Sequence, residues 1–214
     1  MPRMTKRQAL LRQATDLFAV RGYEATPTVE IAAQAGVAEG TLFHHFGTKA
    51  GLLREILIDV LDRYFKQASR RVEAATSGLA ALDALVSFHF AFAAANRNEM
   101  LVAIRDFPYH LLVPGSDGHD DLMSRLLRHM GLFVNCLERG IADGSLRTVP
   151  VDSTAHLLRS LLYGATRLAL LGPLEAPDLS EPALEFCRRG LAAQPADAGS
   201  GPRQSRPAKD ATAR

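Results

Sequence analysis

The chain of 214 residues can bury a sizeable core as one large domain or two small ones, and 47% hydrophobic with 22% charged residues is ordinary for a soluble globular protein. A formal net charge of only +2 excludes a polycation, so any affinity for nucleic acid has to come from a local patch. The N-terminal MPRMTKRQALL lacks the apolar run of a signal peptide, and no stretch approaches the ~18 uncharged apolar residues that span a bilayer, so we expect a cytoplasmic protein with no membrane partner.

Helical periodicity runs through nearly the whole chain without an alternating strand pattern, so we expect an all-α fold of about nine helices. The first predicted helix starts from a cap at Thr5, runs to Arg21 and ends at Gly22. The second begins after Thr26, its expected N-cap, with Pro27 at the first helical position, where the missing N–H costs nothing.

The stretch from Thr28 to Gly47 carries the most functional information. It has the pattern of two short helices joined by a tight glycine turn, the geometry that places one helix in a DNA major groove. Gly36 can take the left-handed backbone that the turn needs. The second short helix spans residues 39–46, with Leu42 and Phe46 on its inward side.

A long fourth helix from Thr48 to about Ser69 should connect two halves of the protein. Later helices are expected over Ser77 or Gly78 to Asn96, Glu99 to Tyr109, Asp121 to Ala142, Ser153 to Leu171, and Glu181 to Ala193. Residues 112–121 form a loop rich in Gly, Pro and Asp. We expect a DNA-binding domain over residues 1–47, a ligand-binding and dimerisation bundle over 48–193, and a disordered tail over 194–214, which has too few large apolar residues to fold.

Residues 22–53, GYEATPTVEIAAQAGVAEGTLFHHFGTKAGLL, resemble the DNA-binding region of the TetR family of bacterial transcriptional regulators. The family's motif positions have counterparts at Thr26, Ile31-Ala32, Ala35-Gly36-Val37, Gly40-Thr41-Leu42-Phe43, His45-Phe46 and Lys49. The rest of the chain resembles the family only in helix count and length. The resemblance implies a homodimer on a palindromic operator, which represses a neighbouring gene until a small molecule releases it, although activation stays an alternative.

The side chains expected to contact DNA follow from a spacing of 100° per residue, which puts Gly40, Thr41 and His44 opposite the inward side and Phe43 at the flank. Thr41 offers a hydroxyl to a phosphate and a methyl to a thymine. The full expected set is Thr26, Thr28, Glu39, Gly40, Thr41, Phe43, His44 and Lys49.

Three of the neighbouring positions allow alternatives. Glu39 either accepts from a cytosine amino group or faces solvent. Lys49 either holds a phosphate or is simply solvated. His45 leans towards the core and is expected to be a half-buried structural residue. Where the family has a serine cap and a tyrosine, this chain has Ala38 and Phe43, which costs ~1 kcal/mol of helix stability and a phosphate hydrogen bond, respectively.

The last two helices indicate self-association, because apolar residues from His156 to Leu171 cover an arc wider than one core face requires. A second apolar surface there would form a four-helix contact between two chains, or else the helix is simply central in its own domain. The expected dimer residues are Leu158, Leu162, Ala165, Ala169, Leu184, Cys187 and Leu191.

A pocket for a small, largely apolar effector is plausible among the helices of the second half. Its candidate lining consists of aromatic and polar residues scattered along core-like helices, each of which taken singly is more often part of the core. The candidates are Phe88, His89, Phe92, Arg105, Tyr109, His110, Asn135 and Tyr163.

Other classes of function lack their motifs. There is no phosphate-binding glycine loop, no nucleophile elbow, and no histidine pair at i, i+4 backed by a carboxylate, so we expect no enzyme, cofactor or metal. We expect the dense cluster His119-Asp120-Asp121 to lie in a loop, as a solvated turn with capping carboxylates. Cys136 and Cys187 lack metal-type spacing and fit a reducing compartment. An action on RNA or protein, or an all-α enzyme, stays a minor alternative.

Overall fold

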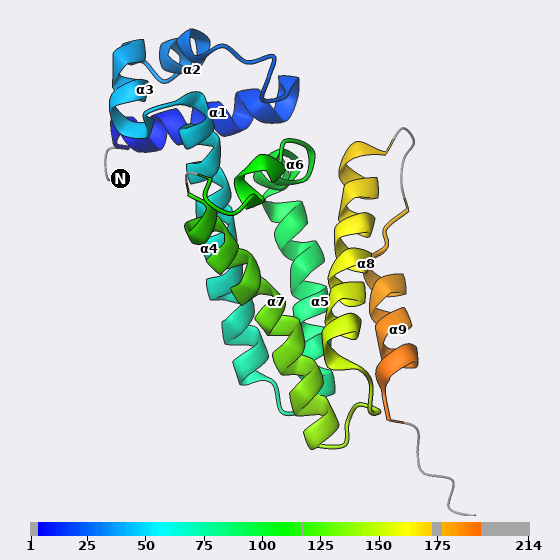
Figure 1. The fold of residues 1–214 in the computed structure, drawn as a ribbon. Coiled ribbons are helices and arrows are strands. Elements are labelled where there is room, and N and C mark those ends of the chain that lie inside the picture. Colours follow the sequence, from blue (N-terminus) through cyan, green and yellow to red (C-terminus); the bar gives the residue numbers. More distant parts are fainter. Residues whose placement is uncertain (1–3, 117, 173–176, 194–214) are drawn as a thin grey trace, which may run out of the picture.

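The computed structural model describes residues 4–116, 118–172 and 177–193. Within these ranges the regular structure is helical, apart from one isolated bridge between Leu146 and Ala192, so the all-α expectation is confirmed. Figure 1 shows a compact head of three helices above an elongated body. The helices are α1 (Lys6–Arg21), α2 (Thr28–Gln34), α3 (Glu39–Phe46), α4 (Lys49–Ala74), α5 (Gly78–Ala95), α6 (Arg97–Arg105), the 3-10 turn η1 (Tyr109–Leu112), α7 (His119–Ala142), α8 (Val151–Leu171) and α9 (Ser180–Leu191).

Side-chain caps are present at the starts of α1, α4 and α5. The Thr5 side chain and Gln8 form a reciprocal capping box at the start of α1, and the hydroxyls of Thr48 and Ser77 cap α4 and α5. The expected cap at Thr26 is wrong. Pro27 is the N-cap of α2, and the buried Thr26 hydroxyl donates instead to the Gly22 carbonyl at 2.8 Å, which fixes the turn that follows α1.

Helix ends differ from the predicted ones where the local chemistry is specific. The predicted helix over residues 99–109 stops at Arg105, because Pro108 disfavours helical backbone at the residue before it, and the chain continues as η1. The helix α4 runs five residues beyond the predicted end at Ser69, since Val72 continues its buried face to the base of the body. The predicted tail, residues 194–214, lies outside the described residues.

Two separate hydrophobic cores organise the chain, and α4 belongs to both. The first core joins α1, α2 and α3 with the upper half of α4, including Leu52, Ile56 and Leu57, and with Val102 of α6. The second core joins the lower half of α4 with α5, α7, α8 and α9. The predicted boundary at residue 47 therefore lies just before a helix that both cores share.

The helix α5 is the centre of the body and contacts α4, α6, α7, α8 and α9. Its 18 residues, with a mean hydropathy of 1.6, are long and apolar enough to cross a membrane by length and composition. This corrects the expectation that no stretch approaches that limit. Its side chains Leu82, Leu85, Val86 and Phe92 are buried among the neighbouring helices, which is the environment of a core helix.

Candidate DNA-binding surface and effector pocket

The outer face of α3 is presented to solvent as the sequence predicts. Leu42 and Phe46 are buried against the head core, whereas Gly40, Phe43 and His44 are exposed and Thr41 is half-buried. His45 is exposed too, so its expected half-buried place is wrong. The two-turn helix buries only a narrow face, and a residue 60° away from Leu42 already lies in solvent.

The first turns of α2 and α3 are joined by a side-chain bond that sequence reasoning missed. The Thr28 hydroxyl donates to the Glu39 carboxylate at 2.6 Å. The Glu39 carboxylate is therefore not simply solvated. To contact a base, it would first have to give up its hydrogen bond to Thr28. Thr26, buried beneath α2, is removed from the expected DNA-contacting set, since it has no surface to offer.

Lys49 lies at the start of α4, as predicted, with a more specific environment than a solvated lysine. Its Nζ donates to the Glu24 carbonyl at 3.2 Å and lies 4.5 Å from the centroid of the Tyr23 ring. These contacts tie α4 to the segment that connects α1 and α2. The ammonium group of Lys49 is thereby held near the edge of the three-helix head.

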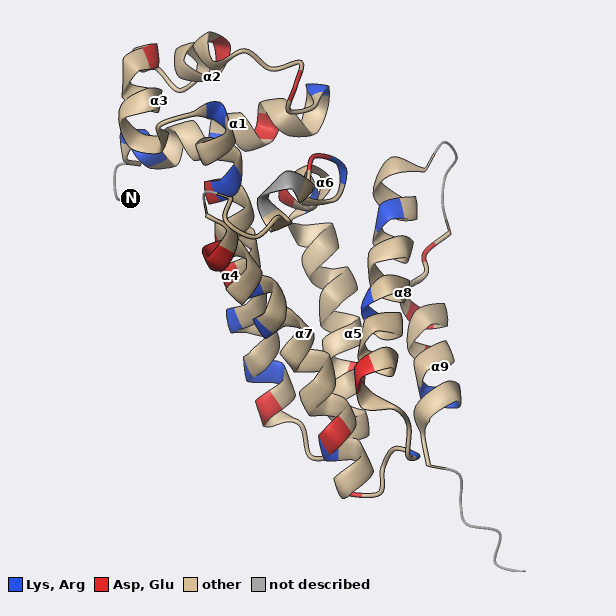
Figure 2. Cartoon of the chain, in the orientation of Figure 1, with Lys and Arg blue, Asp and Glu red and all other residues tan. Residues whose placement is uncertain are grey.

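Charges of both signs are interspersed over the head (Figure 2). Arg7 pairs with Glu55 and joins α1 to α4, while Arg21 pairs with Glu30 at 2.6 Å and joins α1 to α2. These exposed pairs each contribute little to stability. Residues 1–47 contain five Lys or Arg and four Asp or Glu, so the head is close to neutral, as is the whole chain.

A cavity of about 310 Å³ lies in the body and is lined mainly by apolar and aromatic side chains from α4, α5, α6, α7 and α8. Four of the predicted lining residues are there: His89, Phe92, Tyr109 and Tyr163. Residues that sequence reasoning missed include Tyr64, His129 and Arg159. His129 and Phe133 are four residues apart on α7, and this spacing alone could have indicated a shared inward face.

Three of the other predicted lining residues, Phe88, Arg105 and Asn135, are not part of the cavity lining. Phe88 is buried behind it, with its ring centroid 5.0 Å from that of Tyr64, and Asn135 is exposed on α7. Arg105 turns the other way and donates to the carbonyls of Phe18 and Ala19, which caps the C-terminal end of α1. His110 belongs to η1, and its side chain lies outside what the structure describes.

A hydrogen-bonded chain of buried polar groups crosses the cavity wall. The Tyr64 hydroxyl is 3.2 Å from Nδ1 of His89, and Nε2 of His89 is 2.8 Å from the Thr166 hydroxyl. Burial raises the pKa of Tyr64, so the phenol keeps its proton, and the Tyr64 and Thr166 hydroxyls can satisfy either tautomer of His89. Burial also lowers the pKa of His89 to about 4 and lowers that of His129. This wall of the cavity is therefore uncharged at neutral pH, and among the lining residues that the structure describes Arg159 is the one charged side chain.

A larger opening of about 600 Å³ separates the head from the body and has mixed polar and charged walls. Its carboxylates already have partners: Asp16 accepts from Asn98 at 2.9 Å, while Asp59 and Glu99 both accept from Arg63. An apolar effector would gain little there. The smaller apolar cavity is the better candidate for such a molecule.

Most of the predicted dimer residues are buried inside the chain, so their side chains have no surface to offer to a second copy. Six of them are buried within the chain, and of the predicted set only Ala169 is exposed. The large hydrophobic residues that α8 and α9 expose are Leu157 at 70%, Tyr163 at 38%, Leu168 at 46% and Phe186 at 69%. The six buried residues are Leu158, Leu162, Ala165, Leu184, Cys187 and Leu191.

Comparison with known proteins agrees with a helix-turn-helix head on a helical regulatory body, which is the architecture of a DNA-binding transcriptional regulator. The family described as "Bacterial regulatory proteins, tetR family" matches residues 10–56. The transcriptional repressor KstR2 of Mycolicibacterium smegmatis is 31% identical over 191 residues, which cover 87% of this chain and 91% of the relative. The chain belongs to the TetR family, and it is a sequence-specific DNA-binding regulator of transcription.

Further relatives support the same assignment. KstR2 of Rhodococcus jostii is 33% identical over 76% of this chain and 78% of its own length. The solved structure of the ketosteroid transcriptional regulator KstR2 of Mycobacterium tuberculosis has a TM-score of 0.73 at 25% identity, over 90% of this chain and 98% of that chain. The structure of AibR in complex with isovaleryl coenzyme A and operator DNA has a TM-score of 0.69 at 20% identity, covers 88% of this chain and 98% of that one, and shares the fold.

The buried histidines make stability depend on pH. Between about pH 6.5 and 4, His89 binds a proton in the unfolded chain but stays neutral in the folded protein. The free energy of unfolding should therefore fall as the pH falls through this window. His129 shifts in the same direction. Urea unfolding across the window measures the slope, and His89→Gln should make it shallower. Equal slopes in the variant and the wild type would contradict the lowered pKa of His89 in the folded protein.

Proposed function

We propose that two copies of this chain bind a palindromic operator, repress transcription there, and leave the DNA when a largely apolar small molecule occupies the cavity of the body. One observation carries the proposal. The helix that supports the reading head, α4, also supplies Val60, Leu61 and Tyr64 to the cavity wall. Occupation of the cavity and placement of the head therefore involve one rigid element.

The DNA contacts are assigned to the exposed side of α3. His44 and Thr41 reach base edges, Gly40 lets the backbone approach, and Phe43 makes apolar contact. Lys49 turns from the Glu24 carbonyl towards a phosphate. Thr28 and Glu39 act mainly by holding the starts of α2 and α3 together.

Self-association is assigned to the exposed face of α8 and α9 rather than to the buried residues first expected. Leu157, Leu161, Gly164 and Leu168 repeat at intervals of four, three and four along α8, so they form one narrow stripe. A Cβ at Gly164 would have open space around it, which allows another helix to approach closely. Phe186 of α9 extends this apolar surface. A two-fold contact here gives two recognition helices ~34 Å apart.

The effector is expected to have a largely apolar skeleton with an oxygen-bearing group. The cavity lining is mostly apolar, and its histidines and tyrosines supply uncharged hydrogen-bonding groups. Arg159 favours an anionic substituent over a cationic one. The description of the relative KstR2 as a ketosteroid transcriptional regulator supports testing ketosteroids and their carboxylic acids first.

The proposal is tested by footprinting the purified protein on genomic DNA, followed by affinity measurements on the protected duplex at several salt concentrations. We expect a palindromic site whose affinity falls steeply as salt rises. His44→Ala should change the sequence preference, whereas Lys49→Ala should weaken all sites about equally and reduce the salt slope by about one. Equal effects of the two variants would contradict the division of roles, and protection of no duplex at low salt would contradict the function.

The dimer face is tested separately by light scattering. Leu157→Glu should give a monomer, because a carboxylate in the apolar stripe would be buried without a partner. Leu127→Glu makes the same change at a leucine of α7 that is 64% exposed, and should leave the dimer intact. A dimeric Leu157→Glu variant, or loss of the dimer in both variants, would refute this face.

A further inference from the structure

The cavity and the reading head are connected through a few residues of α4. Leu57 is fully within the head core, and the next turn supplies Leu61 and Tyr64 to the cavity. The opposite wall at this level comes from α7, with Leu126, His129 and Phe133. Any occupant therefore rests against the contact between α4 and α7, one turn below the head.

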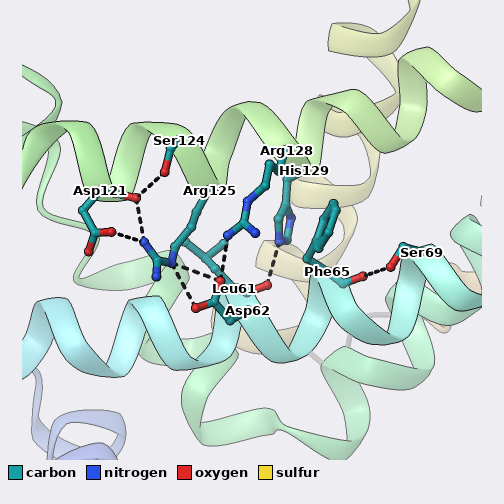
Figure 3. Close-up of polar contacts among 9 residues, drawn as sticks. All are labelled: Leu61, Asp62, Phe65, Ser69, Asp121, Ser124, Arg125, Arg128 and His129. Carbon is teal, nitrogen blue, oxygen red and sulfur yellow. Dashed lines mark hydrogen bonds and ion pairs between the residues drawn. The ribbon is translucent and has the colours of Figure 1, made fainter.

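His129 contacts α4 at this level, and Figure 3 shows its hydrogen bond to the backbone of Leu61. Its Nε2 donates to the backbone carbonyl of Leu61 at 3.1 Å. Because a carbonyl oxygen can only accept a hydrogen bond, Nε2 is the nitrogen that carries the ring proton. Its ring is stacked on that of Tyr64, with centroids 4.6 Å apart and planes 28° apart. One side chain thus holds both the backbone of α4 and an aromatic side chain of the cavity wall.

A group of charged residues on the neighbouring face of the same contact fixes its register. Asp62 of α4 accepts from Arg125 at 3.0 Å and from Arg128 at 2.9 Å, and Arg125 also pairs with Asp121 (Figure 3). The Arg128 guanidinium lies 5.0 Å from the centroid of the Phe65 ring. These contacts lie beside the α4 residues that face the cavity, and they oppose sliding of α4 along α7. His129 fixes the separation of the same two helices at the cavity.

We propose that His129 is a positioning residue for DNA binding: its bond to the Leu61 carbonyl holds α4, and with it the reading head, in the arrangement that fits the operator. The inference rests on the proposed function and adds the residue through which the cavity acts. An occupant that turns or displaces the His129 ring removes this bond. The helix α4 then samples further positions, and the fraction of molecules that match the operator falls.

The size of the effect follows from one hydrogen bond. A typical net contribution corresponds to a factor of about five in an equilibrium constant. If the bond selects the operator-competent arrangement, its loss should weaken operator binding by about that factor, in the purified full chain and without any added small molecule.

The test compares two substitutions of His129 with a matched control substitution on the same helix, α7. His129→Phe keeps an aromatic ring for Tyr64 but has no N–H, and His129→Gln supplies an amide N–H that can reach the Leu61 carbonyl. Arg139→Met is the control. Arg139 also donates from α7 to backbone carbonyls of the α4 end, Val72 at 3.1 Å and Ala75, but far from the cavity.

Operator affinity is measured by fluorescence anisotropy on the footprinted duplex at fixed salt, with the melting temperature of each variant recorded beside it. We expect His129→Phe to weaken binding about fivefold, His129→Gln to restore most of it, and Arg139→Met to lower the melting temperature while changing affinity less than twofold. If His129→Phe does not fold, His129→Met replaces it with the same expectation.

A structural role for His129 without influence on the head would overturn the inference. It would appear as unchanged operator affinity in the variant without the N–H, as equal weakening by the Arg139 control, or as no rescue by glutamine. Failure of the proposed function is a different result, since the wild-type protein would then bind no duplex.

Discussion

The continuity of α4 is the constraint on which the rest of the structure depends. Its upper half is buried in the head and its lower half in the body, so the two hydrophobic cores cannot move independently without bending a helix of 26 residues. The interface between head and body is otherwise modest. It includes the Arg105 cap on α1, the bond from Asn98 to Asp16, and the apolar contacts of Val102, Leu101, Ala103 and Phe107. A small displacement of α4 therefore alters where α3 lies, while α3 keeps its own packing.

The body has an uncommon core for a structural domain, because a chain of hydrogen-bonded polar groups passes through it. Tyr64, His89 and Thr166 join α4, α5 and α8, and each group has a partner. Burying them costs desolvation energy that hydrogen bonds only partly return, and apolar residues of similar volume would serve stability as well. A cavity that recognises a small molecule by a few oriented polar groups needs such residues. The neutral protonation state of the histidines keeps the cavity suited to an apolar ligand.

The sequence allowed the three helices of the head and the inward side of α3 to be predicted, since short-range chemistry determines them. Capping at Thr5, the glycine at position 36 and the inward pair Leu42 and Phe46 all act within a few residues. Predictions failed where a partner distant in sequence decides the outcome. Thr26 is a local exception, because its hydroxyl bonds to the Gly22 carbonyl only four residues earlier instead of capping α2. The apolar arc of α8 was wide enough for two faces, yet its periodicity could not tell which one packs on α5, and the buried face was taken for the dimer face. In the same way, Arg105 was expected in the cavity as a polar residue on a core-like helix, but its side chain caps the end of α1.

The most direct measurement of the shared role of α4 is amide hydrogen exchange in wild type and in a Leu42→Ala variant, which opens a cavity in the head core alone. If the upper half of α4 belongs to the head, protection of residues 52–57 should fall together with that of α1, while residues 68–72 keep theirs. Full protection of residues 52–57 in a variant whose α1 has lost protection would contradict this account, because the head would then be a separate unit that α4 merely adjoins.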